Sequence, residues 1–203
     1  RFMANHHMLQ VDSRPAWRVV TGGSSSYIRA LERAWKASVR LASPVLSIRR
    51  DDQSATVASA HGAESFDHVV LACHSDQAVA LLADPSADER SILGAITYQD
   101  NETVLHTDAR LLPRRKSAWA AWNAFVPAAD DAACTVSYCM NLLQSVQSPD
   151  PFVVTLNRTH AIAPERILAT MNYQHPVHTH ASVAAQSPRD EINGVRRTWY
   201  AGA

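Results

Sequence analysis

VRLASPVLSIRRDDQSATVASAHGAESFDHVVLAC, residues 39–73, is the stretch that decides the fold. Short apolar runs alternate with polar turn residues, a pattern typical of β-strands joined by tight turns. We expect four strands, at 39–41, 45–49, 56–59 and 66–73. Gly62 provides the turn between the last two. The final run, Val69 to Cys73, is apolar at every position and therefore predicts a central strand that is covered on both faces.

The residues on either side of this stretch predict a change of architecture along the chain. Before it, Tyr27, Leu31 and Trp35 recur at helical spacing, so we expect a serine-capped helix from Ser25. After it, helical patterns lie at 76–83, 89–96 and 180–186. Alternating strands follow Ile96 without long helices between them, at 103–107, 118–125, 135–140, 152–157, 167–173 and 197–200. Such a run predicts antiparallel sheet, so the expected fold class is α+β, a mixed α/β arrangement.

Charge and composition exclude several partners. Nineteen Lys and Arg residues balance nineteen Asp and Glu residues, so no net field would attract nucleic acid or an anionic membrane. Arg49-Arg50, for example, is followed at once by Asp51-Asp52. No apolar stretch approaches the roughly 18 residues of a membrane span. Three cysteines without a C-x-x-C pair suit reduced thiols, so we expect a soluble, cytoplasmic protein.

Motifs for hydrolysis or nucleotide binding are missing. G-x-S-x-G, Walker A and G-x-G-x-x-G do not occur. Gly22-Gly23-Ser24 precedes a helix and could cradle a phosphate, although a tight turn with an N-cap is the simpler interpretation. His175, His178 and His180 cluster, but they lack helical i,i+4 spacing and a nearby carboxylate. We therefore expect no metal site.

Aromatic residues are concentrated in SAWAAWNAF, residues 117–125. Trp119 and Phe125 share one parity of the predicted strand, and Trp122 has the other. Such side chains either pack in a core or form a wall that faces a flat ring. The pattern leaves both interpretations open.

Four segments together resemble the flavin-containing amine oxidases, within the wider group that holds protoporphyrinogen oxidases and phytoene-type desaturases. WRVVTGGSSSYIRAL is similar to W-x-x-x-x-G-G and its helix, and VRLASPVLSIRRDDQSATVAS is similar to V-x-L-x-x-x-V-x-x-I. FDHVVLAC is similar to a D-x-V-[IV]-x-A strand, and RTWYAGA to the strand that reaches an A-G-[ED] turn. RPAWRVVTGGSSSYI, LHTD and AAWN are similar to bacterial FAD-binding members of this group.

The resemblance implies FAD as cofactor and a Rossmann-like FAD-binding domain that is only partly contained in this chain. Residues 17–95 and 196–203 would form the partial FAD-binding domain. Residues 1–16 and 96–195 would form an antiparallel-sheet substrate domain with helices. We expect the chain to be part of a longer protein, with the missing G-x-G-x-x-G upstream.

The resemblance also implies positions for the cofactor-binding residues. The backbone of Val45 would meet the FAD adenine. Ala72 and Cys73 would end the strand beside the adenosine and pyrophosphate, and Gly202 would begin the turn beside the pyrophosphate and ribityl chain. These are backbone contacts, so small and apolar residues suit them.

Two residues depart from the family pattern. Ala203 stands where an acidic residue is expected after A-G. Many amine oxidases carry a lysine, linked through water to flavin N5, where this chain has Asn101, Glu102 or Thr103. Lys116 lies too far along the chain to replace it.

The implied function is an FAD-dependent oxidoreductase that moves a hydride from a small organic substrate, an amine or an allylic or lipid-like molecule, to flavin N5. The catalytic residues are not identified by the resemblance. The alternative is a non-catalytic fragment or partner-binding module that no longer holds flavin. An exposed apolar face on the 69–73 strand would then favour self-association.

Overall fold

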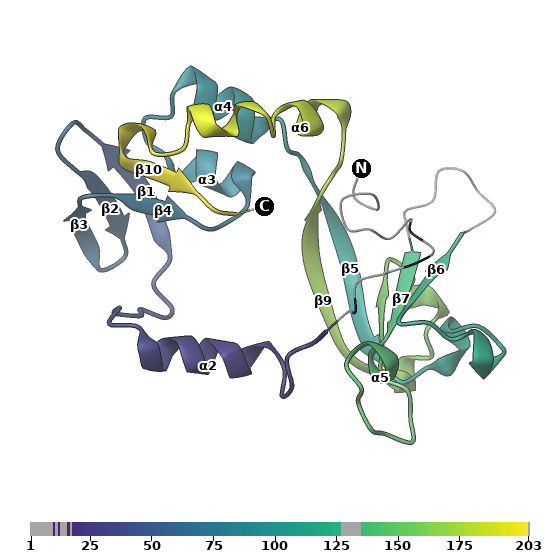
Figure 1. Ribbon diagram of the computed structural model, residues 1–203. Coiled ribbons are helices and arrows are strands. Elements are labelled where there is room, and N and C mark those ends of the chain that lie inside the picture. Colours follow the sequence, from purple (N-terminus) through teal and green to yellow (C-terminus); the bar gives the residue numbers. More distant parts are fainter. Residues whose placement is uncertain (1–9, 11, 13–15, 17, 127–134, 203) are drawn as a thin grey trace.

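The computed structural model describes residues 10, 12, 16, 18–126 and 135–202 (Figure 1). Ala203 and Cys134, along with most of residues 1–17, lie outside this set. The helices are α2 (Ser24–Ala34), α3 (Ser75–Leu81), α4 (Ala87–Gly94), α5 (Met140–Leu143) and α6 (His180–Ala184). Short 3-10 helices are η1 (Ala109–Leu111), η2 (Lys116–Ala118), η3 (Thr159–Ala161), η4 (Pro164–Arg166), η5 (Pro188–Glu191) and η6 (Val195–Arg197).

The strands form three sheets. They are β1 (Val45–Arg50), β2 (Ala55–Ser59), β3 (Gly62–Phe66), β4 (Val69–Leu71), β5 (Tyr98–His106), β6 (Trp122–Phe125), β7 (Thr135–Cys139), β8 (Val153–Leu156), β9 (Ile167–Pro176) and β10 (Thr198–Tyr200). We call the group of β1–β4, β10, α3 and α4 the mixed lobe. The sheet lobe is the five-stranded sheet β6-β7-β8-β5-β9 with its loops. The expected α+β arrangement is confirmed.

The mixed lobe contains an antiparallel sheet, β1-β2-β3, and a parallel pair, β4 and β10. Ile48 of β1 is 1% exposed and packs with Leu71 of β4 and with Leu82, which follows α3. α4 adds Ile92 and Leu93 to the same cluster. Apolar burial of this kind joins the two sheets and the two helices into one packed unit.

Two expectations for the segment before β1 are wrong. No strand forms at 39–41, where Leu41 is 84% exposed and no described strand lies alongside to pair with it. The helix begins after Gly23 and not after a serine cap, and no side-chain capping bond is made there. α2 has no buried residue, so its apolar side chains are not packed against the described part of the chain.

The run 66–73 was also expected to be one covered strand, and this is wrong. Phe66 pairs with Ala55 in the antiparallel sheet, whereas Val69–Leu71 pair with β10. The segment contributes residues to two sheets, so the backbone must bend between Phe66 and Val69. Val70 is 61% exposed, and among the described strands β4 pairs only with β10.

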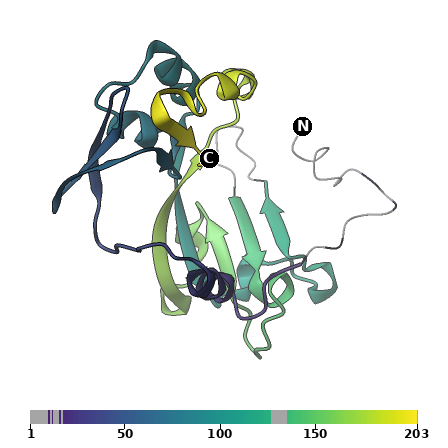
Figure 2. The ribbon, with the colours of Figure 1, turned by 60° about the vertical axis from the view of Figure 1, so that its left-hand side comes forward.

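β5 and β9 are the long strands of the sheet lobe, and they extend from it toward the mixed lobe (Figures 1 and 2). Their register pairs Tyr98 with Pro176 and Leu105 with Ala169. The other three strands join only the later half of β5, through β8. None of the described helices is long and apolar enough to cross a membrane.

The two faces of the five-stranded sheet differ sharply in burial. One carries His106, Val153 and Cys139, all 0% exposed, and we call it the closed face. Leu111, Leu112, Ile162 and Trp119 from the connecting loops cover it. The other carries Leu105, Val154, Tyr138 and Trp122, all at least partly exposed, and we call it the open face.

A hydrogen-bonded chain of polar groups lies within the closed face. His106 Nδ1 accepts from the Asp108 backbone N–H at 3.0 Å, which leaves Nε2 to donate to Thr155 Oγ1 at 2.8 Å. Ser137 Oγ lies 2.8 Å from the same hydroxyl. Burial lowers the pKa of His106, so a neutral imidazole with a structural role is expected there.

Candidate functional site

The candidate site lies where β4 and β10 end. The two strands are parallel, with Trp199 opposite Val70 and Tyr200 opposite Leu71. The Ala201 backbone N–H then donates to the Leu71 carbonyl at 3.0 Å. The next residues of both strands therefore leave the sheet side by side. Ligands of open α/β sheets bind at the carboxyl ends of parallel strands.

Gly202 approaches the backbone of Cys73 too closely for any side chain. A Cβ at position 202 would lie 1.8 Å from the Cys73 carbonyl oxygen and 2.9 Å from its backbone nitrogen. Real Cβ atoms are never so close to other atoms, so only glycine fits here without moving the backbone. The sequence-predicted residues Ala72, Cys73 and Gly202 are thus brought together. Their surface is made of backbone.

The start of β5 lies against this site. The Ser75 backbone N–H donates to the Tyr98 hydroxyl at 3.0 Å, and the His74 ring stacks on the Tyr98 ring at 4.3 Å. In Figure 1 the chain that leaves β10 runs toward β9 and β5. The sheet lobe therefore begins next to the carboxyl ends of β4 and β10.

A hollow of about 540 Å³ adjoins Gly202, and Ser75, Ile96, Arg189 and Tyr200 are among its other lining residues. Cys73, whose backbone Gly202 approaches, is half-buried. Burial, with a further contribution from Asp76, raises the pKa of the Cys73 thiol. A protonated thiol is a poor nucleophile, so Cys73 is suited to backbone contacts and not to covalent chemistry.

A buried ionic network holds β10 in place. Arg50 of β1 and Glu89 of α4 form two hydrogen bonds, at 2.5 and 2.9 Å, and both side chains are almost completely buried. Arg50 also donates to Thr198 Oγ1 at 3.0 Å, and the Tyr200 hydroxyl donates to Glu89 at 2.7 Å. Two of the three residues of β10 are therefore bonded to one ion pair. The Arg50–Glu89 pair therefore holds β10, the strand that ends just before Gly202.

The network keeps both of its charges. Burial disfavours the Glu89 carboxylate, but hydrogen bonds from Arg50 and Tyr200 outweigh burial and lower the pKa of Glu89 to about 2. Burial also opposes the charge of Arg50, yet its bonds to Glu89 raise the pKa of Arg50. Burial and the bond to Glu89 raise the pKa of Tyr200, so its hydroxyl stays protonated and donates.

Acid should therefore weaken the fold through Glu89. The folded chain favours the carboxylate, so the contribution of Glu89 to the free energy of unfolding is fully present above pH 4.5, its ordinary pKa, and is lost as the pH falls toward 2. The loss is on the order of 3 kcal/mol. Urea unfolding at several pH values should show a steeper loss over this window for the wild type than for Glu89→Gln. Equal slopes would contradict this assignment.

Val45 lies in a different hollow from the other three predicted cofactor-binding residues. It is 38% exposed and lines a space of about 440 Å³ together with Ser43, Val57 and Phe66. The exposed ion pair between Arg40 and Glu64 lines the same space. The structure therefore brings together the residues of the two strand ends but does not bring Val45 into contact with them.

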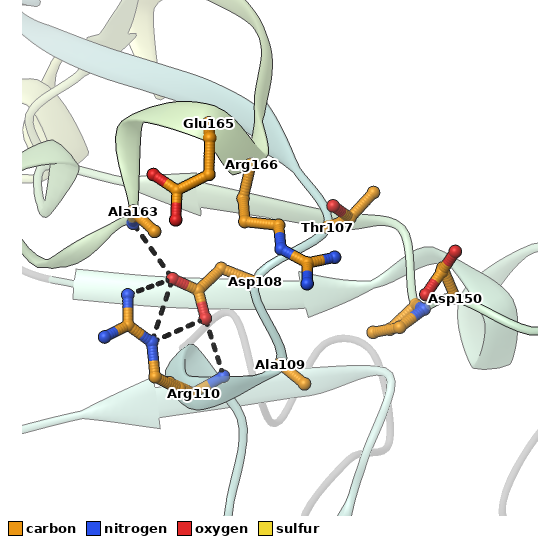
Figure 3. A pocket seen from close by; sticks show the side chains of 9 residues that line it. Thr107, Asp108, Ala109, Arg110, Asp150, Ala163, Glu165 and Arg166 are labelled. Atoms are coloured by element: carbon orange, nitrogen blue, oxygen red, sulfur yellow. Dashed lines mark hydrogen bonds and ion pairs between the residues drawn. The ribbon is translucent and has the colours of Figure 1, made fainter.

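A third hollow, about 440 Å³, is charged and lies at the far end of β5 (Figure 3). Its central carboxylate, Asp108, accepts from the Arg110 side chain at 2.6 Å and from the Ala163 backbone N–H at 2.9 Å. These bonds hold the pKa of Asp108 well below its ordinary value. Asp108 is fully engaged in shaping the loop. Nowhere among the described residues do three or more His, Cys, Asp or Glu side chains gather as metal ligands.

Comparison with known proteins supports the same assignment. The model of flavin-containing amine oxidoreductases matches residues 3–109, just over half of the 203 residues. The chain belongs to the flavin-containing amine oxidoreductase family. No curated protein matches the sequence significantly.

Solved structures share the fold. A CLA-producing fatty acid isomerase from P. acnes has a TM-score of 0.60 at 14% identity, over 89% of this chain and 47% of its own. Putrescine oxidase bound to putrescine has a TM-score of 0.57 at 9% identity, over the same shares. The chain thus spans about half the length of these two solved structures. A partial Rossmann-like FAD-binding fold with an antiparallel-sheet region is the confirmed fold class.

Asn101, Glu102 and Thr103 lie on β5 and point to two different faces of the sheet. Asn101 and Thr103 have the parity of Leu105 and belong to the open face, whereas Glu102 belongs to the opposite face. Asn101 is 3% exposed, accepts from Asn157 Nδ2 at 2.7 Å and lies 3.0 Å from His175 Nδ1. The side-chain amide of Asn101, held by these contacts, therefore lies on the open face, and no lysine lies among the described positions of that face.

Proposed function

We propose that this chain is part of an FAD-dependent oxidoreductase and supplies the half of the flavin site that contacts the adenosine and pyrophosphate. The observation that carries the proposal is the approach of Gly202 to Cys73 at the carboxyl ends of two parallel strands. A backbone surface with no room for a side chain suits close contact with a dinucleotide. Family membership supports the choice of a flavin.

In this proposal each predicted residue has a backbone role. Ala72 and Cys73 lie beside the adenosine and pyrophosphate, and Gly202 lies beside the pyrophosphate and ribityl chain. The Val45 backbone meets the adenine from the neighbouring hollow. Residues 17–95 and 196–203 form the partial FAD-binding domain, and 1–16 with 96–195 form the substrate domain.

When bound, FAD supplies an acceptor at N5 for a hydride from an organic substrate, which is an amine or an allylic or lipid-like molecule. The chain's own residues position the dinucleotide and offer the open face to the substrate. The buried Arg50–Glu89 pair keeps β10 and Gly202 in position. No described residue is assigned a proton-transfer role.

A binding competition tests the assignment to the adenosine and pyrophosphate. FAD added to flavin-free full-length protein should bind saturably, and ADP should compete with it. Riboflavin, which lacks the adenosine and pyrophosphate, should bind at least about tenfold more weakly than FAD. Equal binding of riboflavin and FAD, with no competition by ADP, would contradict the proposed placement.

A second candidate is a non-catalytic module that binds a partner or a second copy of itself. The exposed Val70, at 61%, and the open edge of β4 favour it, because an unpaired apolar strand edge invites association. Sedimentation separates the two functions. A monomeric full-length protein that carries flavin would exclude this candidate.

A further inference from the structure

The open face of the five-stranded sheet is uncharged. Along β5 to β9, none of its described positions carries Asp, Glu, Lys or Arg. One row crosses all five strands and consists of Ala169, Leu105, Val154, Tyr138 and Trp122. An apolar row of this width is unusual on a surface that contacts only water.

Along the row from Leu105 to Trp122 this face is at least partly exposed, whereas Asn101 and Thr103 on the same face are each 3% exposed. Trp122 is 44% exposed and Tyr173 is 51% exposed, whereas Val104 and His106 on the closed face are completely buried. Trp122 and Tyr138 meet edge to face, with ring centroids 6.0 Å apart. The aromatic side chains therefore form a fixed wall and are not part of the core of the sheet lobe.

Polarity changes along the face in the direction of the candidate flavin site. Gln99, Asn101 and His175 lie at the end where β5 begins, next to the Tyr98–Ser75 contact. Leu105 lies six residues after Gln99 on β5. At the usual rise of a strand this separation corresponds to about 20 Å. The wall is thus polar near the strand ends and apolar at a distance from them.

We infer that the substrate is a neutral molecule with a long apolar chain and not a charged amine; this inference rests on the proposed flavin function. In this inference the apolar chain of the substrate lies along the row from Leu105 to Trp122, and the reacting end of the substrate lies near Asn101. A cation on this face would lose water without gaining a carboxylate partner. A neutral chain gains binding energy from each methylene that leaves water.

Matched ligands test the inference on full-length protein by titration calorimetry. Decanol should bind at least about tenfold more tightly than decylamine, which has the same chain and a cationic head. Decanol should also bind at least about 30-fold more tightly than butanol, because its chain is longer. Decylamine binding as tightly as decanol, or equal binding of decanol and butanol, would overturn the inference.

Substitutions that add a carboxylate to the sheet test where the apolar chain of the substrate binds. Trp122→Glu, at a half-exposed position that tolerates charge, should reverse the preference toward decylamine, and Leu105→Glu should do the same if it folds. Thr170→Glu adds the same charge on the opposite parity of exposed β9 and should leave the preference unchanged. An equal shift in Thr170→Glu would overturn the inference. A dimer in sedimentation that Trp122→Glu dissociates, with no decanol bound to the wild type, would also overturn it.

Visible absorbance of the same samples separates this inference from the proposed function. A colourless protein that still prefers decanol would contradict the flavin function and support the apolar wall. A yellow protein that prefers decylamine would support the flavin function and overturn the inference.

Discussion

Gly202→Ala should lower the affinity of the full-length protein for FAD by at least about tenfold. The added Cβ would lie 1.8 Å from the Cys73 carbonyl oxygen, so either Gly202 or the end of β4 must move. Both segments belong to the proposed dinucleotide site, and a shift of either removes the close backbone surface. FAD retained after gel filtration and the dissociation constant from flavin fluorescence measure the effect.

Gly94→Ala is the matched control. No atom lies within 4 Å of a Cβ built at Gly94, and alanine favours a helix more than glycine does. FAD affinity should stay at the wild-type value. Circular dichroism of both variants distinguishes lost binding from lost folding. Wild-type FAD affinity in a folded Gly202→Ala protein would show that the approach to Cys73 is not part of the site.

Glu89→Ala should reduce the free energy of unfolding by about 3 kcal/mol, because it removes the carboxylate that makes two hydrogen bonds to the buried Arg50 and leaves only Asp84 as the ionic partner of Arg50. Tyr200 also loses its hydrogen bond to Glu89, one of the contacts that hold β10. The variant should therefore lose FAD affinity along with stability. Urea unfolding measures the first effect, and FAD titration below the transition measures the second.

Two further variants define the role of this pair. Replacing both partners by apolar residues, Arg50→Met with Glu89→Leu, should recover part of the lost stability because no unpaired charge remains. Glu64→Ala breaks the exposed ion pair with Arg40 and should leave stability unchanged within error. A Glu89→Ala protein as stable as the wild type would contradict the importance of the network.

Strand periodicity predicted the mixed lobe well where local pattern decides structure. The strands predicted at 45–49 and 56–59 correspond to β1 and β2. β3 was missed, because residues 62–65 were assigned to the turn through Gly62. The pattern at 66–73 predicted one covered strand. In the structure the backbone bends after Phe66, and Val69–Leu71 pair with β10 instead. Position 198–200 lies too far along the chain for a local pattern to reveal that pairing.

The network around β10 was not predictable for the same reason. Arg50 is followed in sequence by acidic residues, which suggested local charge compensation. The structure pairs it instead with Glu89 and Asp84, residues that the intervening chain brings back to β1. The capping-box pattern from Ser86 to Glu89 predicts that Ser86 caps a helix and that Glu89 lies in its first turn. It does not predict that the same carboxylate serves a distant arginine.

The open and closed faces show what parity can and cannot predict. The strand predicted at 118–125 gave Trp119 and Trp122 opposite parities, but β6 spans only Trp122–Phe125. Trp119 precedes this strand and packs, partly buried, against the closed face, whereas Trp122 lies on the open face. The sequence could not decide which parity was covered, because the covering residues come from loops at 111–112 and 162. Contacts between segments that are distant in the sequence decide which face of the sheet is covered.

The FAD content of the full-length protein, purified without added flavin, is the most direct test of the central claim. Heat release followed by chromatography identifies and counts the flavin. Stoichiometric FAD in the wild type, with little in Gly202→Ala, is the predicted result. A colourless wild-type protein that binds no FAD when the cofactor is supplied would contradict the account.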